Sequence, residues 1–222
     1  MRAGPSTRER ILEASRRLFN EKGYSATTLT EIASSIGIAQ GNLTYHFPTK
    51  RDLVAGIEKS ARAHVRAERA RLASDAVSED YVDLLFAEMD HTWEHRFLLR
   101  DRTQFTKTPK PARPDPDMVA NFELLHAFLK HMETEGMFRR DLSVDTSALA
   151  RSLWIVSRYW VDHLRELEGV EKISLSDRER GLQNYFAVLL PYLTASGKRD
   201  IESAIEGAST RLATRKEQPI NE

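Results

Sequence analysis

Three neighbouring residues, Gln40, Gly41 and Thr44, have the chemistry to contact the edges of DNA bases. A glutamine amide pairs bidentately with adenine, and a threonine donates or accepts a hydrogen bond or touches the methyl group of thymine. A glycine lets the backbone come close to its ligand. These groups can act together only if a rigid element holds them on one exposed face, and the sequence around them predicts such an element.

Residues 28–47, TLTEIASSIGIAQGNLTYHF, predict two short helices joined by a glycine turn. Thr28 and Glu31 form a capping box, in which each side chain satisfies a free N–H at the start of a helix. The next residues have the spacing of a helix-turn-helix, with a small residue for close approach, a turn glycine and an apolar residue that holds the second helix: Ala33, Gly37 and Leu43. Such a unit presents its second helix, here about 40–46, to the major groove of DNA.

The flanking residues extend this pattern. Ser6 and Glu9 form a second capping box, which opens a helix that Gly23 closes. Pro48 ends the second helix of the helix-turn-helix, and a long helix is expected from about 50 to 73. The sequence therefore predicts a helix before the helix-turn-helix and another directly after it.

The stretch ILEASRRLFNEKGYSATTLTEIASSIGIAQGNLTYHFPTKRDL resembles the DNA-binding domain of the TetR/AcrR (tetracycline-repressor-like) family of bacterial regulators. The marks of the resemblance are F-x-E-x-G-Y-x-x-T-T, then I-A-x-x-x-G-I, then G-N-L-T-Y-H-F-x-x-K. The match covers roughly residues 6–55, about a quarter of the chain. Thr44 is a departure, since the family often has an aromatic residue there.

The resemblance implies a homodimeric transcriptional regulator that binds a near-palindromic operator in double-stranded DNA. It implies three parts: a helix-turn-helix domain over 1–48, a helical effector-binding and dimerisation domain over 49–213, and a disordered tail over 214–222. It also implies a repressor that releases DNA when a small apolar or amphipathic effector binds the C-terminal domain. A DNA-binding dimer that answers to a protein partner instead of a small molecule stays open.

Four residues are expected to contact DNA phosphates. Tyr45, His46 and Lys50 match family positions that hold phosphates through a phenol, an imidazole and an ammonium. Thr28, at a helix N-terminus, is expected to add a bond through its backbone N–H.

The rest of the chain predicts helices only, so the fold class is all-α. Apolar residues recur at three and four residues from Val82 to Phe97, as on one amphipathic helix. Four prolines in 108–117 exclude helix there, and further helices are expected to follow, the last over about 198–212. Aromatic and apolar side chains of this region are candidates either to line an effector pocket or to fill the core: Phe86, Met89, Trp93, Phe122, Phe128 and Trp154.

Two late helices, at about 146–166 and 175–193, are apolar around most of their girth. Such a helix is either central in its own domain or covered by a partner chain. The resemblance favours a partner, because TetR-like proteins dimerise through two late helices of each subunit. The residues expected at this dimer interface are Val156, Trp160, Leu182, Tyr185, Phe186 and Leu189.

The formal net charge is zero, but its distribution is uneven. Residues 1–73 contain 13 Lys and Arg against 7 Asp and Glu, a balance of +6, and the remainder balances it at −6. A basic N-terminal third is typical of phosphate contact. The absence of cysteine, of an apolar N-terminal signal and of a bilayer-length apolar run predicts a soluble cytoplasmic protein with no membrane partner.

One alternative comes from His91-Thr-Trp-Glu94-His95, which matches the H-x-x-E-H motif of zinc peptidases. Two histidines four residues apart on a helix can share a metal. Trp93, between them, belongs to the apolar stripe, so an ordinary helix surface explains the same residues. The expectation is no enzyme, no metal and no cofactor, with a zinc hydrolase as the alternative.

Overall fold

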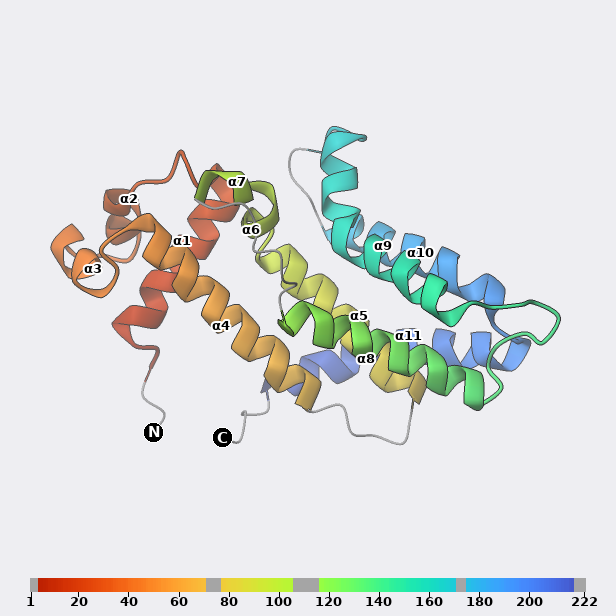
Figure 1. Ribbon diagram of the computed structural model, residues 1–222. Coiled ribbons are helices and arrows are strands. Elements are labelled where there is room, and N and C mark those ends of the chain that lie inside the picture. The colour runs from red at the N-terminus through yellow and green to blue at the C-terminus, as the bar shows by residue number, and fades with distance from the viewer. Residues whose placement is uncertain (1–3, 71–76, 106–115, 171–174, 218–222) are drawn as a thin grey trace. The chain divides into compact units, whose positions relative to one another are not determined.

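The computed structural model describes residues 4–70, 77–105, 116–170 and 175–217, and each named element in these ranges is a helix (Figure 1). The prediction of an all-α fold is confirmed. None of the helices in the described ranges is long and apolar enough to cross a membrane. The elements are α1 Thr7–Lys22, α2 Leu29–Ser35, α3 Gln40–His46, α4 Lys50–Ala70, α5 Val77–Glu94, α6 Phe97–Arg100, α7 Arg102–Phe105, α8 Pro116–Thr134, α9 Thr146–Glu166, α10 Leu175–Leu189, a 3₁₀ turn Leu190–Tyr192, and α11 Ala195–Glu217.

The described residues form two compact units. The first contains α1 to α3, most of α4, the end of α5, and α6 and α7. The second contains the rest of α5 and α8 to α11. Residues 91–105 thus belong to the same unit as the helix-turn-helix, although the sequence suggested placing everything after residue 48 with the second domain.

The first unit has a small apolar core to which every helix from α1 to α4 contributes. Ile11, Phe19, Ile32, Leu43 and Leu53 are fully buried in it. Short helices are only marginally stable in isolation. Burial of the apolar face of each helix in this core supplies the missing stability. The two short helices α2 and α3 therefore depend on this core for their position.

The second unit is built around α9, which packs against both α8 and α10, as Figure 1 shows. Gly181 of α10 makes close packing possible, because a Cβ there would lie 2.8 Å from a ring carbon of Trp160 and 2.8 Å from Cε of Met89. Any side chain at this position would force the Trp160 ring, the Met89 side chain or α10 itself to shift.

The single helix predicted through Phe97 is wrong, because α5 ends at Glu94 and α6 begins at Phe97. Side chains of α1 bind the backbone at the break. Arg16 Nη1 and Asn20 Nδ2 donate to the carbonyl of Glu94 at 2.8 and 2.7 Å, and Asn20 Oδ1 accepts from the N–H of Phe97 at 3.2 Å. These side-chain bonds take the place of the backbone hydrogen bonds that a continuous helix would make at Glu94 and Phe97. Phe97 itself is fully buried in the core of the first unit.

Two other boundaries complete the comparison with the predicted elements. The proline-rich segment lies mostly in 106–115, outside the described residues, and α8 begins at Pro116, where a proline costs no backbone hydrogen bond. The last helix, α11, continues to Glu217, past the predicted end near residue 212.

Candidate nucleic-acid interface

Local hydrogen bonds fix the start of α1 and α2, and both predicted capping boxes are confirmed. The hydroxyl of Thr28 accepts from the N–H of Glu31 at 3.1 Å, and the Glu31 carboxylate accepts from the N–H of Thr28 at 2.9 Å. Lys22 adds an ion pair to Glu31 at 2.8 Å. The bond from Lys22 and those from Thr28 lower the pKa of Glu31 to about 2, so this cap stays ionised well into the acid range.

The turn between α2 and α3 has the form that the sequence predicts. Gly37 has a φ of +70°, a left-handed conformation that favours glycine. The N–H of Ile38 donates to the carbonyl of Ala33 at 3.1 Å, which closes the end of α2. The chain then leaves α2 and enters α3 after only a few residues.

The recognition helix, α3, has one buried side and one exposed side. Leu43 is fully buried and Phe47, at its end, is 3% exposed, so these two anchor α3 to the core as predicted. Gln40 and Gly41 are exposed, and Thr44 is half-buried. The three predicted base-contact residues are thus brought together near the first turn of α3.

Two of these residues already have partners within the unit. Gln40 Oε1 accepts from the hydroxyl of Thr30 in α2 at 2.8 Å, which leaves the two N–H groups of its amide able to donate. The Thr44 hydroxyl donates to the carbonyl of Gly41 at 3.1 Å or of Gln40 at 3.2 Å. Thr44 therefore presents its methyl group and its acceptor lone pairs.

The residues predicted to contact phosphates differ in their exposure and in the partners they already have. Tyr45 is 84% exposed, and its ring meets that of His46 edge-on with 5.3 Å between centroids. The N–H of Thr28 is held by Glu31, so a phosphate there would have to displace a carboxylate. Lys50 is turned inward: its Nζ donates to three backbone carbonyls of the α1–α2 turn.

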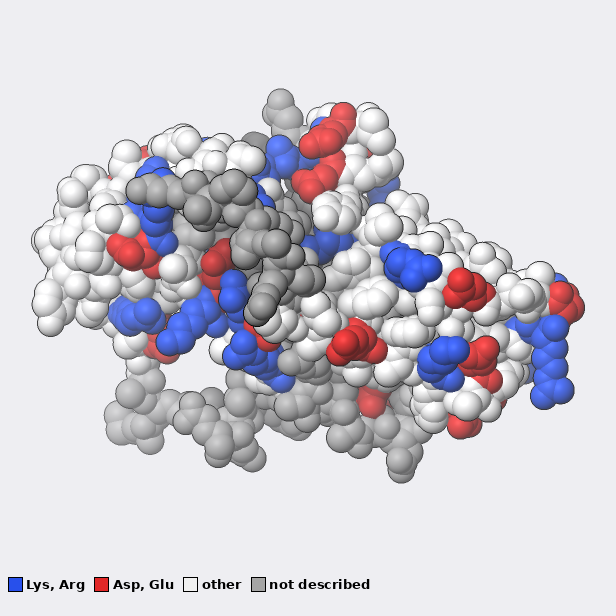
Figure 2. Space-filling model, in the orientation of Figure 1, with Lys and Arg blue, Asp and Glu red and all other residues white. Residues whose placement is uncertain are grey.

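The surface around α3 is mixed in charge. Figure 2 shows an area over α2 and α3 with few charged side chains, and Lys and Arg side chains below it along α1 and α4. Arg8, Arg17, Arg51 and Lys59 are exposed in these two helices. They provide the local positive charge that a DNA backbone requires.

The contacts between α1 and residues 97–105 were not apparent from the sequence. Arg100 donates to the carbonyls of Phe19 and Asn20 at the end of α1, at 2.5 and 3.0 Å. Asp101, 4% exposed, accepts from the N–H of Tyr24 at 2.8 Å and pairs with Arg100 at 2.7 Å. No local pattern reveals this network, because its partners are separated by 77 to 81 residues in the chain.

The second unit contains a small cavity of about 30 Å³. Its lining is Tyr81, Leu84, Leu85, Glu88, Asn121, Leu125, Trp154, Ser157 and Tyr185. The hydroxyls of Tyr81 and Tyr185 lie 2.6 Å apart and are fully buried. Burial raises the pKa of both tyrosines, so both stay protonated.

Of the six residues predicted to line an effector pocket, only Trp154 lines this cavity. Phe86 and Met89 are core residues of the second unit, and Phe122 meets Trp154 edge-on at 5.9 Å between centroids. Phe128 meets the ring of Tyr81 at 5.9 Å. Trp93 lies in the first unit, where the guanidinium of Arg96 stacks 4.1 Å above its ring.

Five of the six residues predicted at a dimer interface are buried inside the second unit itself: Trp160, Leu182, Tyr185, Phe186 and Leu189. Val156 is half-buried. The large apolar residues that α9 exposes are Ile155, at 57%, and Tyr159, at 53%. The exposed apolar surface of α9 therefore lies beside the predicted residues and not on them.

The zinc-hydrolase alternative finds no support. The rings of His91 and His95 are tilted by 33° with centroids 4.4 Å apart, and His95 Nδ1 lies 3.0 Å from the carbonyl of His91. Within the described ranges, no three His, Cys, Asp or Glu side chains form a group that could hold a metal. With His64 and Glu94, His95 lines a groove of about 650 Å³ in the first unit, and burial lowers the pKa of His95.

An N-terminal helix-turn-helix followed by a larger helical unit is the architecture of a helix-turn-helix regulator. Residues 11–57 match the family model of bacterial regulatory proteins of the tetR family, and residues 62–201 match a model described as a bacterial transcriptional repressor. Because the second match covers more than half of the chain, the protein belongs to the TetR family of bacterial regulators.

Individual relatives match over shorter stretches. The probable regulator YttP of Bacillus subtilis is 27% identical over 99 residues, 43% of this chain and 48% of YttP. The regulator AcrR of Shigella flexneri is 37% identical over 59 residues, 27% of each chain. The chain thus spans less than half the length of these two relatives.

Solved structures show the same fold over most of the chain. A TetR-family regulator from Marinobacter aquaeolei superposes with a TM-score of 0.68 at 24% identity, over 91% of this chain and 98% of that one. The ketosteroid transcriptional regulator KstR2 of Mycobacterium tuberculosis gives 0.61 at 21% identity, over 87% and 97%. At these identities the likeness establishes the fold alone.

Proposed function

We propose that this protein is a homodimeric, sequence-specific DNA-binding regulator that represses transcription until a small apolar or amphipathic molecule binds its second unit. The observation that carries the proposal is the asymmetry of α3. Leu43 and Phe47 anchor one side in the core, while Gln40, Gly41 and Tyr45 face solvent on a helix of major-groove dimensions.

DNA contact in this proposal has two parts. Gln40, Gly41 and Thr44 contact base edges, and Tyr45 and His46 contact phosphates beside them. Exposed cations of α1 and α4, such as Arg8 and Arg51, add sequence-independent attraction.

Dimerisation supplies the symmetry of the operator. We place the partner contact on the exposed apolar residues of α9, Ile155 and Tyr159, with Val156 beside them. Apolar side chains exposed by more than half on one helix favour a protein interface. Two copies related by a two-fold axis would present two copies of α3 to half-sites about 34–36 Å apart or a little more.

The effector would enter the second unit at the cavity beside Trp154. The tyrosine pair and Asn121 give it hydrogen-bonding groups within an apolar lining, which is typical of a small-molecule site. The cavity of about 30 Å³ holds little more than one water, so the effector would bind a conformation in which it is wider.

Selection of bound duplexes from a random DNA pool tests the proposal. The expected result is enrichment of a motif with two inverted half-sites, bound by a species twice the 25.4 kDa chain mass in sedimentation. Binding should weaken steeply between about 50 and 200 mM salt. A pool that stays random, or a bound species of one chain, would contradict it.

A further inference from the structure

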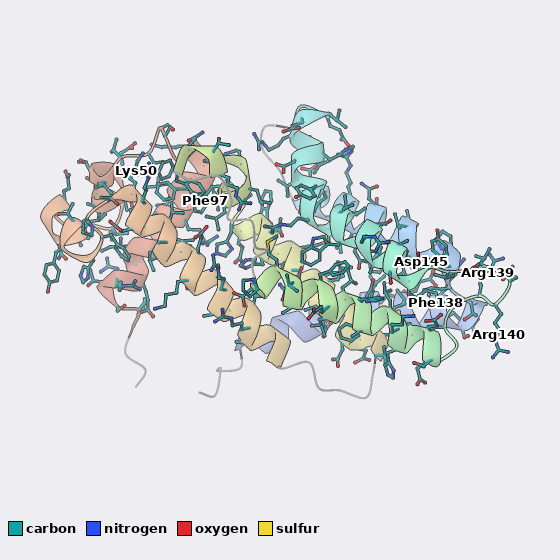
Figure 3. All side chains as sticks on the ribbon, viewed as in Figure 1. Lys50, Phe97, Phe138, Arg139, Arg140 and Asp145 are labelled. Carbon is teal, nitrogen blue, oxygen red and sulfur yellow. The ribbon has the colours of Figure 1, made fainter. Side chains whose placement is uncertain are left out.

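A hydrogen bond between α2 and the first turn of the recognition helix bears on which base Gln40 can read. The hydroxyl of Thr30, in α2, donates to Gln40 Oε1 at 2.8 Å. Gln40 is the first residue of α3, and both side chains are exposed. Figure 3 shows the side chains of this unit on the ribbon, with Lys50 labelled where α4 begins just after the recognition helix. The polar end of Gln40 is therefore held from within the protein.

This bond decides which way round the Gln40 amide lies. An amide carries an acceptor oxygen and a nitrogen with two N–H donors on opposite sides of one carbon atom. Because the oxygen is bonded to Thr30, the nitrogen lies on the side away from α2. The groups that Gln40 can offer to a base in this orientation are its N–H donors.

The two purines differ in the groups that they present in the major groove. Adenine presents the N7 acceptor and the N6 amino donor, so a bidentate contact needs both the oxygen and an N–H of the amide. Guanine presents two acceptors, N7 and O6, and can accept N–H groups at both. An amide that offers only N–H groups thus gains a second bond at guanine, whereas at adenine its donors face the donor of the base. The orientation seen here favours guanine.

Thr44, one turn further along α3, has the opposite character. Its hydroxyl donates to the carbonyl of Gly41 at 3.1 Å or of Gln40 at 3.2 Å, so its lone pairs and methyl group are what it can offer to DNA. The bond from Thr30 ends on the side chain of Gln40. A change at Thr30 should therefore alter the base preference that depends on Gln40 and leave the preference that depends on Thr44 as it is.

We propose that Thr30 is a positioning residue that determines specificity: by binding Gln40 Oε1 it presents the N–H groups of Gln40 to the major groove, so that Gln40 selects guanine over adenine. This inference rests on the proposed DNA-binding function and goes beyond it by naming the base. A glutamine without this bond could turn its amide and pair bidentately with adenine. A residue of α2 thus changes what α3 reads.

Two substitutions of Thr30 separate its hydroxyl from its shape. Thr30→Val removes the hydroxyl and keeps the branched side chain, whereas Thr30→Ser keeps the hydroxyl. Both positions of the bond are exposed, so neither variant creates a buried cavity. A role that is only structural would change stability or affinity for all sequences alike, and only a positioning role would change the base chosen at one position.

The experiment is a binding-site selection on the wild-type protein and both Thr30 variants, at a temperature where circular dichroism shows each of them folded. Parallel selections with Gln40→Ala and Thr44→Ala identify the base pairs that depend on each of these residues. The wild-type protein should prefer guanine to adenine at the Gln40-dependent position by about fivefold or more. In Thr30→Val this ratio should fall by about two- to tenfold, and in Thr30→Ser it should keep the wild-type value. The Thr44-dependent position should be the same in all three.

Adenine at the Gln40-dependent position of the wild-type motif would overturn the inference, and so would a Thr30→Val motif identical to it. A Thr30→Ser motif that shifts together with that of Thr30→Val would overturn it too. If Thr30→Val binds all sequences more weakly by the same factor, Thr30 is a phosphate contact and the inference is wrong. If the wild-type protein selects no motif at all, the proposed function itself fails, and the inference fails with it.

Discussion

The two compact units of this protein are organised by different interactions. In the first, the helices share a small apolar core, and polar contacts at the helix ends add to it: the capping boxes of Ser6 and Thr28, and the carbonyls bound by Lys50 and Arg100. In the second, long helices are placed by packing along their lengths, with a close approach of α10 to Trp160 that only a glycine at 181 allows. The polar contacts of the first unit orient its short helices at the surface, whereas the packing in the second unit encloses its apolar interior.

This difference predicts how each unit responds to substitution. Loss of a buried side chain in the second unit should lower stability strongly, because the cavity forms among long helices that cannot collapse around it. Loss of a polar contact in the first unit should cost less stability and more DNA affinity, because it moves a helix that must fit a groove. The following substitutions test that contrast, from the largest expected effect to the smallest.

The largest loss of stability is expected from Leu153→Ala in α9. Leu153 is fully buried, and truncation of such a residue costs about 2–5 kcal/mol. Urea unfolding should show a lower midpoint with an unchanged slope. Arg151→Ala, at an exposed position of the same helix, is the control and should change stability by less than about 0.5 kcal/mol. Equal effects of the two would mean that α9 is not packed as described.

The tyrosine pair gives the next largest effect. Tyr185→Phe leaves the buried hydroxyl of Tyr81 without its partner and should cost about 1–3 kcal/mol. The reciprocal variant Tyr81→Phe should behave alike. The double variant should cost clearly less than the sum of the two, because it leaves no orphaned hydroxyl. Additive losses in thermal unfolding would show that the two hydroxyls do not interact.

Thr28→Ala removes the N-cap of α2, which should cost about 1 kcal/mol. Its operator affinity should fall further than that stability loss alone explains, since α2 supports the recognition helix. Ser34→Ala, at an exposed position in the same helix, is the matched control and should change neither property appreciably. A Thr28 variant that loses stability but keeps full affinity would weaken the contrast between the two units.

The smallest effect concerns pH. Burial lowers the pKa of His95 from its ordinary value near 6.5, Arg16 and His64 lower it further, and the His91 carbonyl and Glu94 oppose them. Below about pH 6.5 the unfolded chain therefore binds a proton more readily than the folded one, and stability falls as pH falls towards about 5. His95→Gln should show a smaller drop in melting temperature between about pH 7 and pH 5. His64→Gln, which removes one of the groups that lower the pKa of His95, should reduce the drop by a smaller amount than His95→Gln.

Much of the first unit could be predicted from the sequence because its signals are local. Capping boxes, the turn at Gly37 and the buried positions Leu43 and Phe47 all depend on residues within a few positions of each other. The carbonyls bound by Lys50 are 23 to 26 residues away, and those bound by Arg100 are 80 and 81 residues away. Sequence periodicity does not predict such distant contacts, so those of Lys50 and Arg100 could be identified only from the structure.

In the second unit, the sequence predicted which helix faces are apolar but not what covers them. Helical periodicity correctly predicted that Trp160 and Leu189 lie on apolar faces, but not whether a neighbouring helix or a second chain covers them. The structure covers both within one chain and exposes Ile155 and Tyr159 instead. The end of α5 was missed for a related reason, since the side chains that bind its last carbonyl come from α1.

The central claim is that α3 reads DNA sequence through Gln40 and Thr44. The direct measurement is a binding-site selection on the wild-type protein, Gln40→Ala and Thr44→Ala, with Ser152→Ala of the second unit as a control for folding. A base contact discriminates by about 1–3 kcal/mol. Each α3 variant should therefore relax preference at one or two base pairs, and the change should appear in both half-sites while the control selects the wild-type motif. Indistinguishable motifs from all four proteins would contradict the claim and would place sequence recognition outside these two residues.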